Sequence, residues 1–298
     1  LPREYASFVS AFERVGHMRF VEADEALELF PRVWERVRSE RPGMFARSRE
    51  WWDLRVISDP EERRQGAGPK RFVAFERDGL AEGYAIYRHN PAWEDGVSAS
   101  KLDVLEALGA TREATREVWR YLLDIDWSAT ITAELLPPDH PLFLLLATPR
   151  RMRYRMGDGI WVRLVDVGAA LTGRSYASDG AVVFDVSDDF CPWNEGRWRL
   201  ENGDARRTDD EPDLRLAVDA LGSAYLGGVT FAQLDQAFRV EELRRGATAR
   251  ADAMFRTQLA PLVSRDLLGR GQVDVERRPF SLGAFEADPA AVRLDDLA

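Results

Sequence analysis

The chain has 298 residues, a formal net charge of −10 and a single cysteine. This length accommodates two domains of ordinary size, and the acidic balance argues against nucleic acid as a partner, which requires a basic face. The longest apolar run, residues 142–147, is far shorter than the ~20 residues that a membrane span needs. One cysteine excludes an internal disulfide framework, so we expect a cytoplasmic protein without a membrane span.

The first half of the sequence predicts a domain over residues 18–165. Residues 1–17 are interpreted as a remnant or linker from a missing N-terminal domain, because the chain begins with Leu1 and not with methionine. Apolar periodicity then predicts a strand at 18–21, a helix capped by Asp24 that Pro31 kinks or restarts, and a second helix from Ser48. The remaining expected elements are strands at 71–76, 83–89 and 100–108, a helix capped by Thr111, a strand at 129–136, a short buried helix at 141–147 and one or two closing strands at 152–165.

Residues 166–256 predict a second domain. Asp166 is placed to cap a helix that ends at Gly173, and Asn202-Gly203 is a strong signal for a hairpin turn. Thr230 and Gln233 have the spacing of a capping box. Strands are expected at 181–187, 197–201, 204–208 and around 214–218, and helices after Thr230 and at 248–255. Both domains are therefore expected to be α+β, with mixed sheets, and residues 257–298 to form an atypical tail.

The element order of residues 18–165 resembles the GNAT acyltransferase fold. In that family, the turn from the fourth strand into the third helix reads Gln/Arg-x-x-Gly-x-Gly/Ala, and its amides hold the pyrophosphate of acyl-CoA. The corresponding stretch here is Glu106-Ala-Leu-Gly-Ala-Thr111. Gly109 is retained, but Glu106 would repel a phosphate and Thr111 adds a Cβ where the backbone should approach it. We therefore expect a degenerate CoA loop and assign no cofactor-binding residue.

A second stretch, Arg63-Arg-Gln-Gly-Ala-Gly68, matches the same signature letter for letter. Pro69 and a predicted strand follow it, so no helix N-terminus would face a ligand there. A solvated surface loop is the better interpretation.

The second half resembles the sterol-carrier-like (SCP2-like) C-terminal domain of the Eis (enhanced intracellular survival) family. The motifs that support this resemblance are Asp158-Gly-Ile-Trp-Val-Arg163, Ala169-Ala-Leu171, Arg174-Ser-Tyr-Ala177 and Leu221-Gly-Ser-Ala-Tyr-Leu-Gly227. With the first half, the resemblance covers about residues 18–256. Eis-family members look like tandem GNAT N-acetyltransferases: an active first GNAT domain, a degenerate second one and the carrier-like domain, assembled into hexamers.

This resemblance implies that the chain is the C-terminal part of an N-acetyltransferase that acetylates amines of the aminoglycoside or lysine type. It also implies a homo-oligomer, with acetyl-CoA as co-substrate held by the missing N-terminal domain. The family's general-acid tyrosine would lie before Leu1, and the tail would displace the family's catalytic C-terminal carboxylate. We therefore assign no catalytic residue, and the fragment alone is expected to be inactive.

Two tryptophans are candidates for a substrate pocket. By the family resemblance, Trp52 matches a tryptophan that lines the acceptor pocket, and Trp161 is a second candidate. An aromatic wall can hold an ammonium group by cation–π contact, but core packing explains either tryptophan about as well. Arg151, Arg153 and Arg155 alternate along a predicted strand, and an edge strand or a subunit contact is favoured there over an anion site.

No metal site is expected, because His17, His89 and His140 lack ligand spacing and no Cys-x-x-Cys motif occurs. Cys191 is interpreted as an idle loop thiol. Two alternatives to the transferase stay open at this point. One is a sterol- or lipid-carrier-like binding protein, and the other is a non-catalytic pseudoenzyme remnant.

Overall fold

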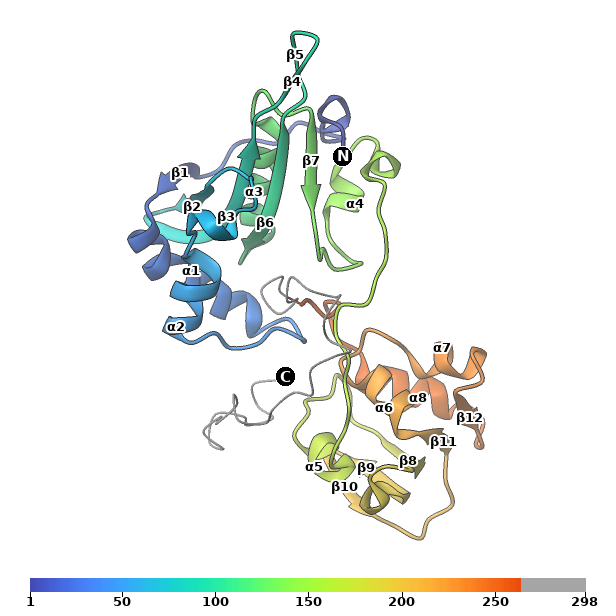
Figure 1. Ribbon diagram of the computed structural model, residues 1–298. Coiled ribbons are helices and arrows are strands. Elements are labelled where there is room, and N and C mark those ends of the chain that lie inside the picture. Colours follow the sequence, from blue (N-terminus) through green and yellow to red (C-terminus); the bar gives the residue numbers. More distant parts are fainter. Residues whose placement is uncertain (264–298) are drawn as a thin grey trace. The chain divides into compact units, whose positions relative to one another are not determined.

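The computed structural model describes residues 1–263, and these fall into two compact units (Figure 1). Unit 1 comprises Leu1–Glu40 and Ala46–Gly157, and unit 2 comprises Arg41–Phe45 and Asp158–Leu262. Both units combine helices with a five-stranded mixed sheet, which confirms the predicted α+β class. The greater part of the predicted tail, residues 264–298, lies outside the described residues.

Unit 1 is built on a sheet with the strand order β1-β2-β3-β6-β7, in which only the β6–β7 pair is parallel. Its elements are η1 (Arg3–Tyr5), β1 (His17–Val21), α1 (Ala23–Arg38), α2 (Arg49–Trp51), η2 (Trp52–Ile57), η3 (Glu61–Arg63), β2 (Lys70–Arg77), β3 (Leu80–Asn90), β4 (Trp93–Glu94), β5 (Val97–Ser98), β6 (Lys101–Gly109), α3 (Arg112–Asp124), β7 (Thr130–Ala133), α4 (Leu142–Leu145) and η4 (Pro149–Met152).

Helices α1 and α3 cover opposite faces of this sheet (Figure 1). Because successive strand residues point to opposite faces, Phe72 of β2 meets Phe30 of α1, while Val73 joins Val118 of α3 in a second core. The inner strands β2 and β3 are therefore buried on both faces. Lys70, at the start of β2, turns its Nζ inward and donates to the carbonyls of Val56 (2.5 Å) and Ser58 (2.9 Å).

Strand β6 contains a bulge that limits its pairing with β7. Ile86 pairs with Glu106 and Tyr87 pairs with Val104, which leaves Leu105 as an extra residue. The β6–β7 ladder runs only from Lys101↔Thr130 to Val104↔Ala133. Beyond the bulge, β6 pairs with β3 alone, as far as Gly83↔Gly109, and leads into α3.

Three local predictions for residues 18–165 are wrong. The N-cap of α1 is Glu22 and not Asp24, and α1 runs unbroken through Pro31. No strand forms between residues 153 and 165. The alternating apolar residues there, Ile160, Val162 and Leu164, instead pack one side of an irregular segment onto the core of unit 2.

Unit 2 has the strand order β10-β9-β8-β11-β12, with β8 and β11 parallel. Its elements are α5 (Val167–Thr172), β8 (Ala181–Ser187), η5 (Pro192–Asn194), β9 (Gly196–Glu201), β10 (Asp204–Arg207), β11 (Leu214–Ala217), α6 (Val218–Tyr225), α7 (Phe231–Gln236), β12 (Val240–Glu242) and α8 (Ala247–Phe255). The caps at Asp166 and Thr230 form as predicted. Helix α6 was not predicted, because Leu214, Leu216 and Val218 alternate as in a strand.

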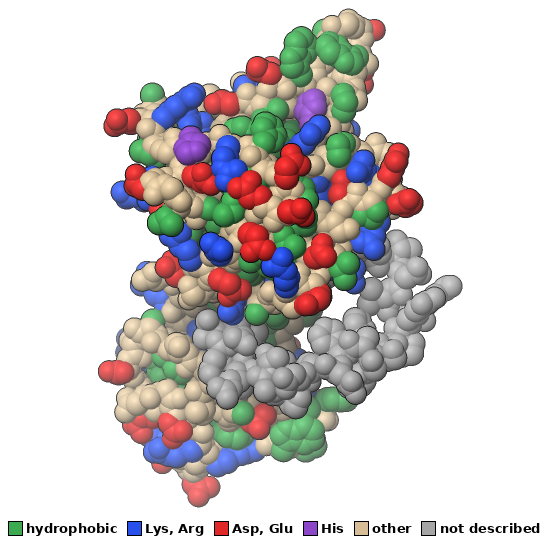
Figure 2. Space-filling model, turned by 90° about the vertical axis from the view of Figure 1, so that its left-hand side faces the viewer, with side chains coloured by type: hydrophobic (Ala, Val, Ile, Leu, Met, Phe, Trp, Pro, Cys, Tyr) green, Lys and Arg blue, Asp and Glu red, His purple; other side chains and the backbone are tan. Residues whose placement is uncertain are grey.

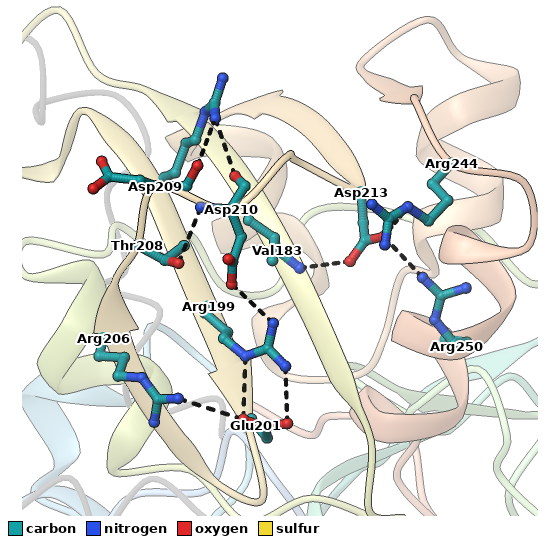
Figure 3. A network of polar contacts seen from close by, with 11 residues as sticks. Val183, Arg199, Glu201, Arg206, Thr208, Asp209, Asp210, Asp213, Arg244 and Arg250 are labelled. Carbon is teal, nitrogen blue, oxygen red and sulfur yellow. Dashed lines mark hydrogen bonds and ion pairs between the residues drawn. The ribbon is translucent and has the colours of Figure 1, made fainter.

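Charged side chains on the exposed side of the unit 2 sheet pair with one another (Figure 3). Arg199 binds Glu201 (2.9 Å) and Asp210 (2.9 Å). Asp213 lies deeper, accepts a hydrogen bond from the Val183 amide and pairs with Arg250 (3.0 Å). This carboxylate thereby ties β8 to α8.

A second buried carboxylate, Asp188, fixes the loop that leads into η5. Asp188 is 3% exposed and accepts hydrogen bonds from the Asn194 side chain, the amides of Cys191 and Phe190, and Arg163. Burial alone would raise the pKa of Asp188, but these donors outweigh it and lower the pKa to about 2. The charged form is therefore the one that stabilises the fold.

We predict that Asp188→Asn lowers the free energy of unfolding at pH 7 by about 2–4 kcal/mol, because an amide cannot accept all of these hydrogen bonds. The folded-state pKa of Asp188 is depressed, so its contribution is complete above its ordinary pKa, about 4, and is lost as the pH falls toward about 2. Urea unfolding of both proteins between pH 7 and pH 2 should show the difference shrinking below about pH 4. A pH-independent difference would contradict this assignment.

Candidate functional site

Trp52, the first candidate pocket residue, lies in a buried aromatic cluster of unit 1. Trp34 from α1, Trp52 from η2 and Tyr84 from β3 are each at most 1% exposed. Trp52 meets Trp34 edge to face with ring centroids 6.0 Å apart, and Phe30 stacks on Tyr84 at 4.2 Å. These contacts place Trp52 in the core of this unit.

The guanidinium of Arg47 occupies the π faces of this cluster. Its Cζ lies 3.4 Å from the ring centroid of Trp34 and 4.6 Å from that of Trp52. Arg47 also forms a two-pronged ion pair with Glu106, with Nη1–Oε1 at 3.0 Å and Nη2–Oε2 at 2.7 Å. Tyr84 donates its hydroxyl to the same carboxylate at 2.5 Å. The aromatic rings around Trp52 therefore already bind a cation, which is the guanidinium of Arg47.

Sequence reasoning missed Arg47, although one signal for it was present. Glu106 is the one charged residue in the apolar or small stretch 104–109 of β6, and a carboxylate in such a stretch requires a cationic partner when it is buried. The partner is 59 residues away in the sequence, and nothing local identifies it. The structure turns Glu106 toward Arg47, so its charge is neutralised within unit 1.

The N-terminus of α3, where the resemblance places an acyl-CoA pyrophosphate, is closed by groups of the chain. Thr111 caps the helix by accepting from the Ala114 amide (3.1 Å) and donates its hydroxyl to Glu82 (3.2 Å). The Ala110 amide donates to the carbonyl of Glu82 (2.7 Å). Glu82 itself is 8% exposed and pairs with Arg77.

Gly109 completes this closure. A Cβ on Gly109 would lie 2.2 Å from the Thr115 amide nitrogen, so the glycine lets the end of β6 pack directly on α3. A pyrophosphate at this position would lie beside the Glu82 carboxylate, whose charge Arg77 compensates (2.8 Å), and would compete with that carboxylate for the Thr111 hydroxyl. The residues at the start of α3 do not fit the phosphates of acetyl-CoA.

The second stretch that matches the CoA signature, residues 63–68, is a loop that leads into β2 and not into a helix. The Gly68 amide donates to the side chain of Asn90 (2.7 Å), and its carbonyl accepts from Arg88. Arg88 pairs in turn with Asp59 (2.5 Å). Gly68 packs closely on β3, since a Cβ there would lie 2.4 Å from the carbonyl oxygen of His89.

Trp161, the second candidate, lies in unit 2 and is 86% exposed. Core packing therefore explains Trp52 but not Trp161. Arg163, two residues after Trp161, pairs with Asp188 (2.5 Å), and its Cζ lies 5.6 Å from the ring centroid of Phe190. Cys191 is buried, and its amide donates to Asp188.

The predicted basic strand is absent. Arg151 lies in η4, and its Cζ is 4.5 Å from the ring centroid of Tyr5. Arg153 and Arg155 are exposed in the irregular segment that follows. Within residues 1–263, no group of three or more His, Cys, Asp or Glu side chains is arranged to hold a metal ion. No helix in the same range is long and apolar enough to cross a membrane.

We predict that Glu106→Gln lowers the free energy of unfolding by about 3–5 kcal/mol, because it leaves the Arg47 guanidinium buried beside a neutral amide. The matched variant is Arg47→Met/Glu106→Gln, which removes both charges and should be less destabilised than Glu106→Gln alone. Urea unfolding followed by tryptophan fluorescence measures both. Equal stability of Glu106→Gln and the parent chain would show that the ion pair does not support the cluster.

Comparison with known protein families agrees with this architecture. A GNAT acetyltransferase domain model matches residues 43–164, and a sterol carrier protein domain model matches residues 167–264. A protein described as an uncharacterized N-acetyltransferase from Streptomyces avermitilis is 44% identical over 251 residues, which cover 82% of this chain and 60% of the relative. N-acetyltransferase Eis from Mycobacterium tuberculosis is 31% identical over 247 residues, which cover 80% of this chain and 57% of that protein.

Solved structures give the same result. Eis1 from Mycobacterium abscessus superposes with a TM-score of 0.70 at 30% identity, covering 88% of this chain and 65% of that structure. A GCN5-related N-acetyltransferase from Anabaena variabilis, at 17% identity and a TM-score of 0.65, shares the fold. The chain thus spans about 60% of the length of these curated relatives. It contains a GNAT acetyltransferase domain followed by a sterol carrier protein domain, and it belongs with the Eis-like N-acetyltransferases.

Proposed function

We propose that this chain is the C-terminal part of an N-acetyltransferase that transfers the acetyl group of acetyl-CoA to amines, with aminoglycoside- or lysine-type acceptors. GNAT acetyltransferases use acetyl-CoA, yet the start of α3 is filled by Thr111 and the Glu82 carboxylate. This closure is the observation that supports the proposal most directly. The acetyl-CoA would be bound by a further GNAT domain, in the part of the relatives that this chain does not span.

In this proposal, the chain shapes the acceptor side of the site and provides contacts between subunits of a homo-oligomer, a hexamer by family resemblance. The amine nitrogen attacks the thioester carbonyl and forms the amide bond as the C–S bond breaks. The amine loses one proton, and the leaving thiolate of coenzyme A takes up one proton. Binding contributes proximity and orientation, and the net charge of −10 favours the approach of protonated amines. A cytoplasmic location is part of the same proposal.

The two tryptophans contribute differently under this proposal. Trp161 is exposed and can offer its ring to an acceptor, while the ring of Trp52 faces Arg47. Trp161 is therefore the better candidate for a wall of the acceptor pocket. Trp52 would act by holding the fold of unit 1.

The alternative of a lipid carrier receives less support from unit 2. Phe184, Phe231 and Phe255 contact one another in its core, with centroid separations between 4.9 and 6.1 Å. Tyr176 adds a fourth ring to this group at 5.3 Å from Phe255. Side chains of the chain thus fill the position between sheet and helices where an apolar ligand would be expected. Mass spectrometry of the purified protein for bound lipid distinguishes the two functions.

We predict that the 298-residue chain alone neither binds coenzyme A saturably nor turns over acetyl-CoA, because the start of α3 presents a carboxylate to the phosphates. Isothermal titration with coenzyme A and a thiol-release assay measure the two properties. The protein translated from the complete reading frame should show both activities. A saturable complex of the lone chain with coenzyme A against Gly109 would contradict the proposal.

Trp161 can be tested in the same complete protein. We predict that Trp161→Ala raises the KM for an aminoglycoside acceptor by about tenfold, the loss of one cation–π contact, with a smaller change in kcat. The matched control is Phe238→Ala, because Phe238 is an exposed aromatic residue of the same unit. An unchanged KM in Trp161→Ala would remove this residue from the acceptor site.

A further inference from the structure

A pair of exposed tryptophans projects from the end of the unit 1 sheet. Trp93 lies in β4 of a short hairpin and is 60% exposed, and Trp127, between α3 and β7, is 66% exposed. The hairpin extends beyond the neighbouring strands in Figure 1, and Figure 2 shows hydrophobic side chains gathered at the same end. The two ring centroids are 5.3 Å apart and the ring planes are inclined by 52°. Rings at this separation contact each other, so a ligand can meet only their outer faces.

The fold holds this aromatic pair in place. Asp95 and Gly96 both have positive φ (49° and 79°), as a type I′ hairpin turn requires. Ser98 donates its hydroxyl to the carbonyl of Trp127 at 2.6 Å. Trp127 itself adopts a left-handed backbone, with φ of 60°, which is unfavourable for a bulky residue. The fold thus accepts a local cost while presenting both rings to solvent.

Three exposed carboxylates accompany the two rings. Asp95 lies in the hairpin turn, and Asp124 and Asp126 shortly precede Trp127. None of the three carboxylates forms a hydrogen bond or an ion pair with another residue in the range 1–263. We call these carboxylates, together with Trp93 and Trp127, the acidic tip. It combines two aromatic faces with negative charge that the described part of the chain does not neutralise.

The buried aromatic cluster of unit 1 shows what such a combination binds. There, the rings of Trp34 and Trp52 lie 6.0 Å apart, and the Arg47 guanidinium lies on the face of Trp34, with Cζ 3.4 Å from the ring centroid. Glu106 pairs with the same guanidinium through both carboxylate oxygens. The acidic tip presents the same kinds of group, two indole rings and carboxylates, to solvent.

Charge and shape restrict the partner that the acidic tip can bind. Its carboxylates repel phosphate-bearing surfaces, both membranes and nucleic acids. The ammonium group of lysine is a compact and strongly hydrated charge, whereas a guanidinium is planar and weakly hydrated. A guanidinium can therefore stack on an indole face and bind a carboxylate with its edge at the same time. The acidic tip accordingly favours arginine over lysine.

We propose that the acidic tip is a binding site for an arginine-bearing segment of a partner protein. The net charge of −10 attracts a basic protein over a long range, and it gives no such advantage to a second copy of this chain. This inference is independent of acetyl transfer, and its test requires no substrate.

The first test compares three peptides on the full chain by fluorescence anisotropy. The probe is a fluorescein-labelled peptide of sequence Gly-Arg-Gly-Arg-Gly, and its two counterparts carry lysine or the uncharged analogue citrulline in place of arginine. The arginine peptide should bind saturably, and more weakly at high salt. The lysine peptide should bind about threefold more weakly, the difference of one exposed cation–π contact. The citrulline peptide should show no saturable binding.

The second test removes the rings. Trp93→Ala/Trp127→Ala should raise the dissociation constant of the arginine peptide at least about tenfold, as expected for truncation of central aromatic anchors. The matched control is Phe238→Ala, which removes an aromatic side chain that is 98% exposed in unit 2 and should leave binding unchanged. Circular dichroism spectra that match the parent establish that each variant is folded.

The third test removes charge and keeps the rings. Asp95→Asn/Asp126→Asn should also raise the dissociation constant, and it preserves the hairpin because asparagine followed by glycine favours the same turn. Asp179→Asn/Asp209→Asn makes the same change in net charge at exposed positions of unit 2. This control should bind the arginine peptide like the parent chain.

Four results would overturn the proposal. They are an arginine peptide that does not bind saturably, a lysine or citrulline peptide that binds as tightly as the arginine peptide, folded tip variants that bind like the parent, and control variants that lose binding to the same extent as the tip variants. Sedimentation velocity on the same proteins covers the other occupant. If the tip variants weaken self-association while the parent chain binds no peptide, the tip meets a second copy and not an arginine-bearing partner.

Discussion

The buried ion pair between Arg47 and Glu106 is the contact on which the arrangement of unit 1 depends. A guanidinium inside an apolar cluster is tolerated only when its charge is paired and its donors find acceptors, and Glu106 pairs with it through both carboxylate oxygens. The pair therefore links the segment between α1 and α2 to strand β6. The indole rings of Trp34 and Trp52 then pack on the cation, so aromatic burial and charge pairing reinforce each other.

This cluster and the closed start of α3 have a common character. At both positions a group of the chain stands where a ligand would be expected: Arg47 against the aromatic wall, and the carboxylate of Glu82 at the helix N-terminus. Gly109, which the sequence alone associates with phosphate binding, serves the close contact of β6 with α3. The GNAT fold of unit 1 is thus stabilised at both positions by groups of the chain itself.

Local sequence signals predicted local structure well, and long-range contacts poorly. The caps at Ser48, Thr111, Asp166 and Thr230 form because each depends on residues three positions apart. Pro31 was expected to interrupt its helix at a cost of about 3 kcal/mol, but the fully buried side chains on the same helix, Phe30 and Val33, pack well enough to keep it continuous.

The failures have equally physical causes. The apolar side chains that alternate in residues 160–164 show that one side of this segment is buried. They do not show whether a neighbouring strand is present to form the backbone hydrogen bonds of a sheet. Arg47 and Glu82 could not be assigned from sequence, because their partners Glu106 and Thr111 lie 59 and 29 residues away. The hairpin of β4 and β5 was missed because its strands are only two residues long.

The inward orientation of Lys70 bears on how such a chain can coexist with a reactive thioester. The chain has two lysines in 298 residues, and the Lys70 ammonium is engaged by backbone carbonyls. Lys101 is thus the single exposed lysine. Apart from three histidines, the remaining basic residues are arginines, which stay protonated at neutral pH and are poor nucleophiles. The surface can therefore be rich in cations and still offer almost no side chain that acetyl-CoA could modify by chance.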